Sequence, residues 1–366
     1  MYLDNLAKNS EEISKSFNGD FVEINKKMSR LMKQARDNAK GDTCFYCGKR
    51  VGSFCNSHNI PAFCLRNIEQ NGKVLNANSI IQFPFLFKEE QGVGDAGTFH
   101  IICNECDNTI FQDYEDPNAY ERALSHKILA AIALKCSLKF IYKRKVETEL
   151  YKLMGDIKYS EEYLETNSVN SLDLVDYLND YKKAKKYLKS NDADGYYLID
   201  YMLLDYVTPI TFQAPIALYV DFDGNIVNDI YNKDANYHMK DLYVCVFPLK
   251  AKTVIILFID NNEKRYRKFY KKYRSMSQIE KLSVINYLIF LYSEDFYLSS
   301  MVKDEIQKNE TIKTLTGKTS RAFMSEWDLY NTDVYGNIKM EYDLNKHSDI
   351  PNFLSKEYGI ATEGAV

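Results

Sequence analysis

The chain has 366 residues, of which 45% are hydrophobic and 27% are charged, a balance typical of a folded protein with a sizeable core and room for two domains. Its formal net charge of −4 excludes a generally basic nucleic-acid binder, so any such contact needs a local basic surface. No run of about 18 uncharged apolar residues is present, and the first residues are polar, so we expect no membrane span, no signal peptide and a cytoplasmic location.

Residues 1–40 are polar and are predicted to be helical. Between Asn25 and Arg50 the sequence has eight basic residues against two acidic ones. This basic segment leads directly into the first cysteine pair. It is either the solvated face of a helix or a contact for a phosphate backbone.

Two Cys-x-x-Cys pairs, Cys44/Cys47 and Cys103/Cys106, dominate residues 41–118. Each pair can turn two thiolates onto one ion, so the four predict a structural tetrahedral zinc, and reduced thiols in a cytoplasm favour metal over disulfides. The alternative is a site of Cys44, Cys47, His58 and one later cysteine, with Cys55 as another candidate. The insert between the pairs is predicted to form loops and short strands, and residues 98–102 a strand that ends at Cys103.

His58 lies in the segment Ser57-His58-Asn59-Ile60-Pro61, between the two pairs. An imidazole can take a proton from water near neutral pH, so His58 is a candidate general base, with a structural or zinc-ligand role as the alternative. Asp107 and Asn108 follow Cys106 in the first turn of a predicted helix, where a carboxylate could hold Mg²⁺ or simply favour the helix N-terminus. Three later acidic residues could add a ligand: Asp113, Glu115 and Asp116.

These motifs together resemble the HNH endonuclease family over about residues 40–118. The resemblance rests on Cys-x-x-Cys, a histidine followed by x-Ile-Pro, and a second Cys-x-x-Cys with a polar residue immediately after it. It implies a ββα-metal unit braced by a treble-clef zinc, with His58 activating water and Asp107 or Asn108 binding a catalytic Mg²⁺ or Mn²⁺. Ser57 stands where the family usually has Asp, Glu or His, and Thr98 and His100 are the candidates for its central asparagine.

The rest of the chain is predicted to be a helical region followed by a sheet. Residues 118–190 are expected to be helical, with a break around Asn167–Ser171, and Asn191–Gly195 is a candidate boundary. Strands are then expected over residues 210–221, 224–231, 242–247 and 253–259, with a hairpin turn at Asp221–Asn225. Helices are expected over 262–275 and over 277–292, where Ser277 and Glu280 form a capping box, and the tail from about Asp333 is expected to be irregular.

Residues 264–274 contain seven basic residues interleaved with four aromatic ones. On a helix, Tyr266, Phe269, Tyr270 and Tyr273 have the spacing of a core-facing stripe, which favours packing for the aromatics and a solvated face for the charges. The functional alternative is phosphate contact with base stacking.

The sequence therefore predicts an α+β protein with three regions: an HNH-like zinc module over 1–118, a helical region over 119–190 and an α+β regulatory or recognition domain over 191–366. The expected function is a metal-dependent endonuclease acting on DNA, as the effector of a bacterial defence system. The alternative is a non-catalytic zinc protein that binds nucleic acid or a protein partner. Nucleic acid is the expected partner, with a protein partner or a second copy of the chain as a further one, and no membrane.

Overall fold

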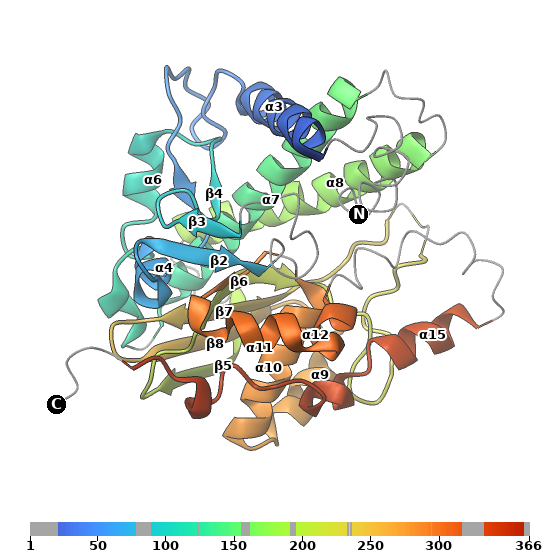
Figure 1. The fold of residues 1–366 in the computed structure, drawn as a ribbon. Helices are drawn as coiled ribbons and strands as arrows, with labels where there is room; N and C mark the ends of the chain where they lie inside the picture. Colours follow the sequence, from blue (N-terminus) through green and yellow to red (C-terminus); the bar gives the residue numbers. More distant parts are fainter. Residues whose placement is uncertain are drawn as a thin grey trace. The chain divides into compact units, whose positions relative to one another are not determined.

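The computed structural model describes residues 21–77, 89–122, 124–154, 162–190, 195–232, 234, 236–293, 295–316 and 333–361. These residues form a mixed α/β structure with a helical middle and an antiparallel sheet (Figure 1). The chain divides into two compact units. Unit 1 contains Met1–Asn59, Thr98–Tyr114 and Ala130–Asn191, and unit 2 contains Ile60–Gly97, Glu115–Leu129 and Asp192–Val366.

This division differs from the predicted regions ending at residues 118 and 190. The insert Ile60–Gly97, which lies between the two cysteine pairs in the sequence, belongs to unit 2 rather than to the module that contains the cysteines. The helical middle, in turn, belongs largely to the same unit as the cysteines. Both Cys-x-x-Cys pairs therefore lie in unit 1, although the chain leaves that unit between them.

Unit 1 combines a short two-stranded ribbon with helices. In the ribbon, β1 (Ser57–His58) pairs antiparallel with β4 (Thr98–Phe99), and α6 (Asn104–Ile110) follows β4. The long helices are α3 (Phe21–Lys40), α7 (His126–Met154), which begins in unit 2, and α8 (Glu162–Lys189). The predicted break at Asn167–Ser171 is wrong, because α8 continues through it; the segment has no Gly or Pro to stop a helix.

Unit 2 is built on a seven-stranded sheet with the order β3-β2-β9-β6-β7-β8-β5. All its neighbouring strands pair antiparallel. The strands are β2 (Lys73–Asn76), β3 (Glu90–Gly92), β5 (Tyr196–Leu204), β6 (Ile210–Ile216), β7 (Leu242–Pro248), β8 (Thr253–Asp260) and β9 (Tyr297–Leu298). Every residue of β7 is buried, as expected for a strand covered on both faces.

The predicted strands at 242–247 and 253–259 are confirmed as β7 and β8, whereas the prediction for 224–231 is wrong. That segment makes only an isolated bridge, Val220 to Ile226, around the expected turn. In the turn, one oxygen of the Asp221 carboxylate accepts from the amides of Asp223 and Asn225, and Gly224 has a φ of +72°, a conformation that suits glycine.

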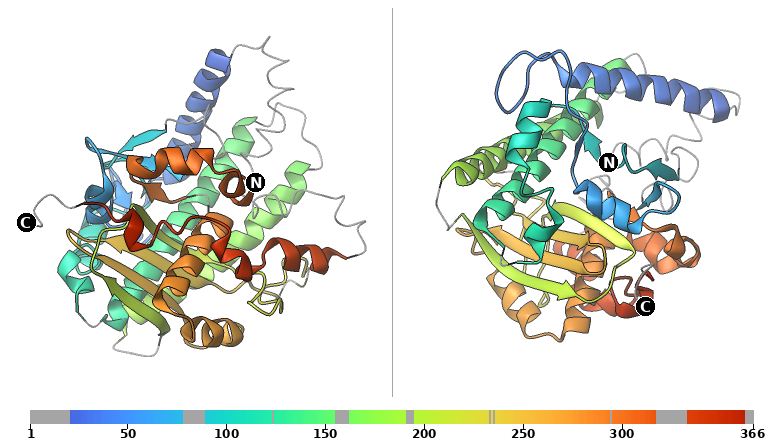
Figure 2. Two further views of the ribbon diagram at one scale, coloured as in Figure 1. Left: turned by 60° about the horizontal axis from the view of Figure 1, so that its bottom comes forward. Right: turned by 90° about the vertical axis from the view of Figure 1, so that its left-hand side faces the viewer.

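Helices cover the sheet, as Figure 2 shows from two further sides. α4 (Ala62–Ile68) contacts β6 and β7, and α10 (Gln278–Tyr292) is buried from Leu282 to Leu291. The predicted capping box of Ser277 and Glu280 at the start of α10 is confirmed. The remaining short helices are α9 (Arg267–Arg274), α11 (Lys303–Lys308), α12 (Glu310–Leu315) and α15 (Val334–Glu341), with 3-10 turns at Pro117–Tyr120, Ser300–Val302, Leu344–Ser348 and Lys356–Tyr358. α15 lies in the tail that was expected to be irregular.

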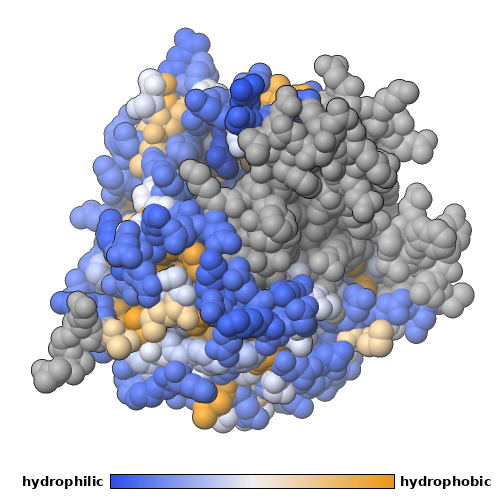
Figure 3. Space-filling model, viewed as in Figure 1, coloured by the Kyte–Doolittle hydropathy of each residue, from blue (hydrophilic) through white to orange (hydrophobic). Residues whose placement is uncertain are grey.

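Hydrophilic residues dominate the face of the molecule drawn in Figure 3, where apolar residues form small separate patches. Among the described residues, no helix is both long enough and apolar enough to span a bilayer.

We expect Tyr266→Phe to destabilise unit 2, because the buried Tyr266 hydroxyl accepts from the Leu218 amide and donates to a main-chain carbonyl. Removing it leaves the Leu218 amide without this acceptor, at a cost of about 1–3 kcal/mol. Urea unfolding measures the loss. Tyr270→Phe in α9, the helix that begins directly after Tyr266, is the control, since Tyr270 is only half-buried; equal losses in both variants would contradict the prediction.

Candidate functional site

The two cysteine pairs meet at the start of α6. The first pair lies on a tight turn in which the Gly48 amide donates to the Cys44 carbonyl and Gly48 has a φ of +72°, the left-handed conformation that glycine adopts most easily. The second pair lies at the N-terminus of α6, with Cys103 as its N-cap residue. A backbone bond from Phe45 to the Ile101 carbonyl joins the two segments.

The four sulfurs form a compact cluster that fits one tetrahedral metal ion. The Sγ atoms of Cys44, Cys47, Cys103 and Cys106 all lie within 4.8 Å of one another, and those of Cys44 and Cys106 are 3.9 Å apart. Zinc–sulfur bonds of about 2.3 Å in a tetrahedron place neighbouring sulfurs about 3.8 Å apart. The cluster therefore matches the predicted four-cysteine site, and His58 is not needed to complete it.

The surroundings of the thiols favour ionised sulfur at Cys44. Burial alone would raise the pKa of its thiol, but hydrogen bonds from the main chain of Cys47, Cys103 and Tyr46 outweigh burial and lower the pKa to about 7. At Cys106, burial and the neighbouring thiols raise the pKa. Several thiolates in so small a volume repel one another, and a dication removes that repulsion.

The two aromatic residues between Cys44 and Cys47 pack on α8. Lys185 of α8 donates to the Tyr46 carbonyl at 2.7 Å, and its ammonium lies 4.1 Å from the centre of the Tyr46 ring. Tyr181 of the same helix meets the Phe45 ring edge-on, with 5.1 Å between the centroids. The first cysteine pair thus lies beside the thiols of α6, and the residues between its cysteines contact α8.

The ribbon and α6 occur in the order strand, strand, helix. His58 lies on β1, half-buried, with Thr98 of β4 as its partner across the ribbon. The neighbouring Ser57 is fully buried and its hydroxyl donates to the Asp107 carboxylate of α6 at 2.6 Å. A hydrogen bond from the Tyr114 hydroxyl to the Asn59 carbonyl fixes the residue on the other side of His58.

Asp107 is the centre of a largely buried polar network, with 15% of its side chain exposed. The Lys135 ammonium of α7 lies 2.8 Å from Oδ1 of Asp107, the oxygen that also accepts from Ser57, and the Cys55 thiol lies 3.4 Å from Oδ2. Burial opposes ionisation of Asp107, but attraction to the Lys135 ammonium and the hydrogen bonds from Lys135, Ser57 and Cys55 outweigh it, so the pKa of this carboxyl lies below its ordinary value. Asp107 is therefore an anion whose charge is already balanced within the protein.

Lys135 has no exposed side-chain surface, and aromatic rings surround it. Its ammonium lies 3.9 Å from the centre of the Phe111 ring, 5.5 Å from that of Tyr114 and 6.0 Å from that of Phe99. We did not predict a role for this residue from the sequence. A lone lysine within the apolar run of α7 from Ile128 to Leu138 is the signal that could have identified it, since buried lysines are rare unless paired.

The arrangement around Asp107 does not fit a divalent cation. Its carboxylate already holds an ammonium, and within the described part of the chain no group of three or more Cys, His, Asp or Glu ligands is found besides the four cysteines. Asn108 and Asp113 are exposed, Glu115 accepts from the Ala62 amide, and Asp116 caps a 3-10 turn. Of the two candidates for the family's asparagine, Thr98 faces His58 across the ribbon, and the His100 ring lies 6.0 Å from that of Tyr142.

We expect the purified chain to contain one zinc ion per molecule, measured by inductively coupled plasma mass spectrometry. Cys47→Ser should lose that zinc, because it removes one of four ligands at an exposed position where the core is not disturbed. Cys55→Ser is the control and should retain it. Zinc retained by Cys47→Ser, or lost by Cys55→Ser, would contradict the four-cysteine assignment.

We expect Lys135→Met to destabilise the protein by about 3–5 kcal/mol in urea unfolding, because it leaves a largely buried carboxylate without its cation. The double variant Lys135→Met with Asp107→Asn should lose less than the sum of the two single variants, since the pair acts as a unit. Lys127→Met on the exposed part of the same helix is the control. A loss below about 1 kcal/mol, as for a surface ion pair, would contradict a buried pair.

Comparisons of the chain with protein-family models, with curated proteins and with solved structures give no match. The HNH resemblance therefore rests on the motifs and on the order of the ribbon and the helix, and the function argued from it is a proposal.

Proposed function

We propose that unit 1 is a metal-dependent endonuclease of the HNH type that hydrolyses phosphodiester bonds of DNA. One observation carries the proposal: the histidine of the motif lies on the first strand of an antiparallel ribbon that is followed by a helix, and the four-cysteine cluster holds the start of that helix. The resemblance implies these parts in this order: two strands and a helix, with a histidine on the first strand and four zinc-binding cysteines beside the helix.

His58 is the proposed general base. An imidazole accepts a proton from an attacking water without a large energetic cost near neutral pH. The bonds on either side of His58, from Ser57 to Asp107 and from Tyr114 to the Asn59 carbonyl, fix the main chain that carries the ring. Such pre-organisation supports a catalytic role, because the base must lie within hydrogen-bond reach of its water.

A catalytic Mg²⁺ or Mn²⁺ is the part of the proposal that rests on the resemblance alone. Asp107 is balanced by Lys135 and does not offer a ready ligand, so we assign it to positioning β1 against α6 and derive no step through the cation. Asn108 is exposed beside it. The requirement for a divalent cation is therefore tested directly below.

The basic segment that leads into the first cysteine pair is the proposed contact for the DNA backbone. On α3, Ala35 and Ala39 are buried, whereas five basic residues are exposed: Lys26, Lys27, Arg30, Lys33 and Arg36. Lys49 and Arg50 instead form ion pairs with Glu105 and Asp42. Exposed cations beside the module would attract phosphates from a distance, with an effect that falls as salt rises.

The cellular role that we propose is a cytoplasmic effector nuclease of a bacterial defence system, in which unit 2 serves recognition or regulation. This part of the proposal is supported only by the pairing of a nuclease-like module with a second unit. A protein partner or a second copy of the chain would act through unit 2.

A second candidate function is a zinc protein without catalytic activity that binds nucleic acid or a protein partner. The ion pair between Asp107 and Lys135 favours it, because this pair occupies the carboxylate that the resemblance assigns to the catalytic metal. In this case the four-cysteine site and the ribbon of β1 and β4 form a binding surface and have no catalytic role.

We expect His58→Ala to abolish cleavage of supercoiled plasmid while the zinc content and the circular dichroism spectrum stay unchanged. His126→Ala, at an exposed position at the start of α7, is the control and should cleave like the wild type. If His58→Ala loses zinc or unfolds, the histidine is structural. If it cleaves at the wild-type rate, the mechanism is wrong.

The cation requirement separates the two candidate functions. Wild-type protein is incubated with plasmid in Mg²⁺, in Mn²⁺ and in EDTA, and zinc content is measured in each arm so that loss of the structural ion is not mistaken for loss of a catalytic one. Nicking with Mg²⁺ or Mn²⁺ but not in EDTA, with zinc retained, is the expected result. Absence of nicking under every metal would favour the binding protein.

A further inference from the structure

In unit 2, one side of α9 and the turn before it present a dense group of cations, which we call the cationic face: Lys264, Arg267, Lys268, Lys271 and Lys272. All five are exposed, and residues 264–274 contain no acidic residue. Within the described part of the chain, none of the five has an ion-pair partner, whereas two exposed lysines elsewhere, Lys308 and Lys356, each pair with a carboxylate. A polyanion would relieve the mutual repulsion of these charges.

The cationic face borders a shallow hollow of about 500 Å³. The hollow is lined by Arg267, Lys271 and Arg274 together with the half-buried ring of Tyr270. The guanidinium of Arg274 lies 5.3 Å from the centre of the Tyr270 ring and 5.2 Å from that of Tyr197. Cationic side chains and an aromatic ring therefore line the same hollow.

The hollow is fixed in place by the inner side of α9. Tyr266, Phe269 and Tyr273 are fully buried, which confirms that these aromatics serve packing. This leaves Tyr270 as the member of the stripe that lines the hollow.

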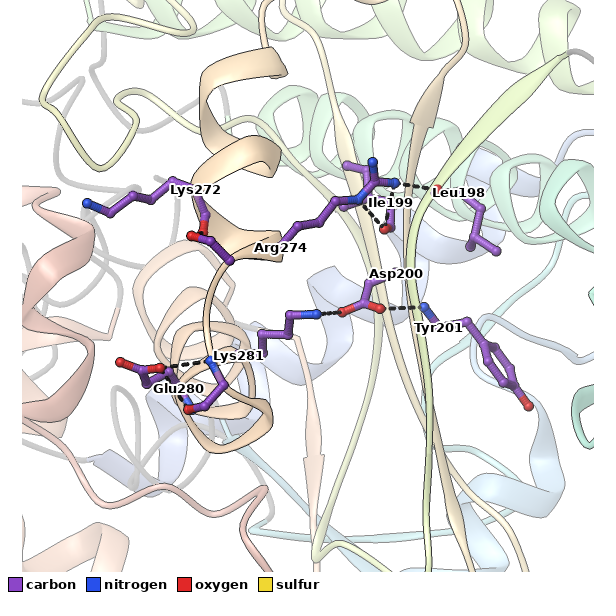
Figure 4. Close-up of polar contacts among 10 residues, drawn as sticks. Leu198, Ile199, Asp200, Tyr201, Lys272, Arg274, Glu280 and Lys281 are labelled. Carbon is purple, nitrogen blue, oxygen red and sulfur yellow. Dashed lines mark hydrogen bonds and ion pairs between the residues drawn. The ribbon is translucent and has the colours of Figure 1, made fainter.

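Arg274 fastens the end of α9 to the edge strand β5, as Figure 4 shows. The pairing of β5 with β8 shifts between Leu198 and Asp200, so Ile199 is the extra residue of a bulge, and its carbonyl accepts from Arg274 at 2.9 Å. Lys281 of α10 pairs with Asp200 at 3.1 Å on the same strand. In Figure 4, the Lys272 side chain extends away from the strand that Arg274 contacts. The helix that carries the cationic face is therefore anchored to the sheet by these contacts.

We propose that the cationic face and its hollow bind the backbone of a single-stranded nucleic acid, with a base stacked on Tyr270. Single-strand binding surfaces combine a positively charged track for phosphates with aromatic rings for bases, and both are present here. An anionic membrane is the poorer fit, because the apolar side chains of α9 face inward and leave none to enter lipid.

This proposal does not rest on the proposed nuclease. The cationic face lies in unit 2, and binding is measured without cleavage, so either proposal can fail while the other holds. If both hold, unit 2 is a second place at which the chain contacts nucleic acid.

The test measures binding of a fluorescein-labelled 20-nucleotide oligothymidylate to the full-length His58→Ala chain by fluorescence anisotropy. Arg267→Gln with Lys271→Gln should weaken binding at least tenfold and lower the slope of log K against log salt by about 1.4, since each neutralised phosphate contact contributes about 0.7 for a single strand. Lys308→Gln with Lys356→Gln is the control, because it removes the same charge from exposed lysines elsewhere. Tyr270→Leu should weaken binding of the oligonucleotide more than that of a 20-base-pair duplex.

The same measurements are repeated in a background of Arg30→Gln with Lys33→Gln, so that binding through α3 cannot hide the effect. Equal affinities for the Arg267/Lys271 variant and its lysine control in both backgrounds would overturn the proposal. So would binding to vesicles with 30% phosphatidylserine that depends on Arg267 and Lys271 while oligonucleotide binding does not.

Discussion

A lysine ammonium removed from water is stable only if an anion stays beside it, and in unit 1 that anion is Asp107. The pair joins α7 to α6, and the hydrogen bond from Ser57 extends the connection to β1. Three elements that are distant in the sequence are thus oriented by one carboxylate. The aromatic rings around Lys135 exclude water and make the partner indispensable.

The first turns of α6 carry two kinds of constraint next to each other. Cys103 and Cys106 belong to the cluster that fits a zinc ion, and Asp107 faces the lysine and the ribbon. The helix therefore contributes two thiols to the cysteine cluster and a carboxylate to the ion pair, and His58 lies between two residues that each make a hydrogen bond within unit 1. The carboxylate at the position expected for a catalytic metal is therefore engaged in structural contacts.

The parts of the fold that the sequence predicted are those with local signals. The Cys-x-x-Cys pairs, the capping box of Ser277 and Glu280, and the apolar runs of β7 and β8 depend on neighbouring residues only. β5 was missed because the bulge at Ile199 shifts the alternation of Tyr196–Leu204 and because the strand includes Asp200. β2 and β3 were expected as short strands, but their place in the large sheet depends on β9, more than 200 residues later. Likewise, the partner of Asp107 could not be identified, because Lys135 comes from a helix beyond the module.

The strand order of unit 2 has a consequence for folding during synthesis on the ribosome. All four cysteines have been translated once Cys106 has emerged, so they can bind a metal ion while the nascent chain is still short. The sequence looped out between the two pairs contains β2, whose sheet neighbour β9 is made only at Tyr297–Leu298. Closure of the four-cysteine cluster around a metal ion would then tether that loop at both ends. β2 could pair with β3 inside the loop, but its other edge would stay unpaired until almost two hundred further residues had been translated.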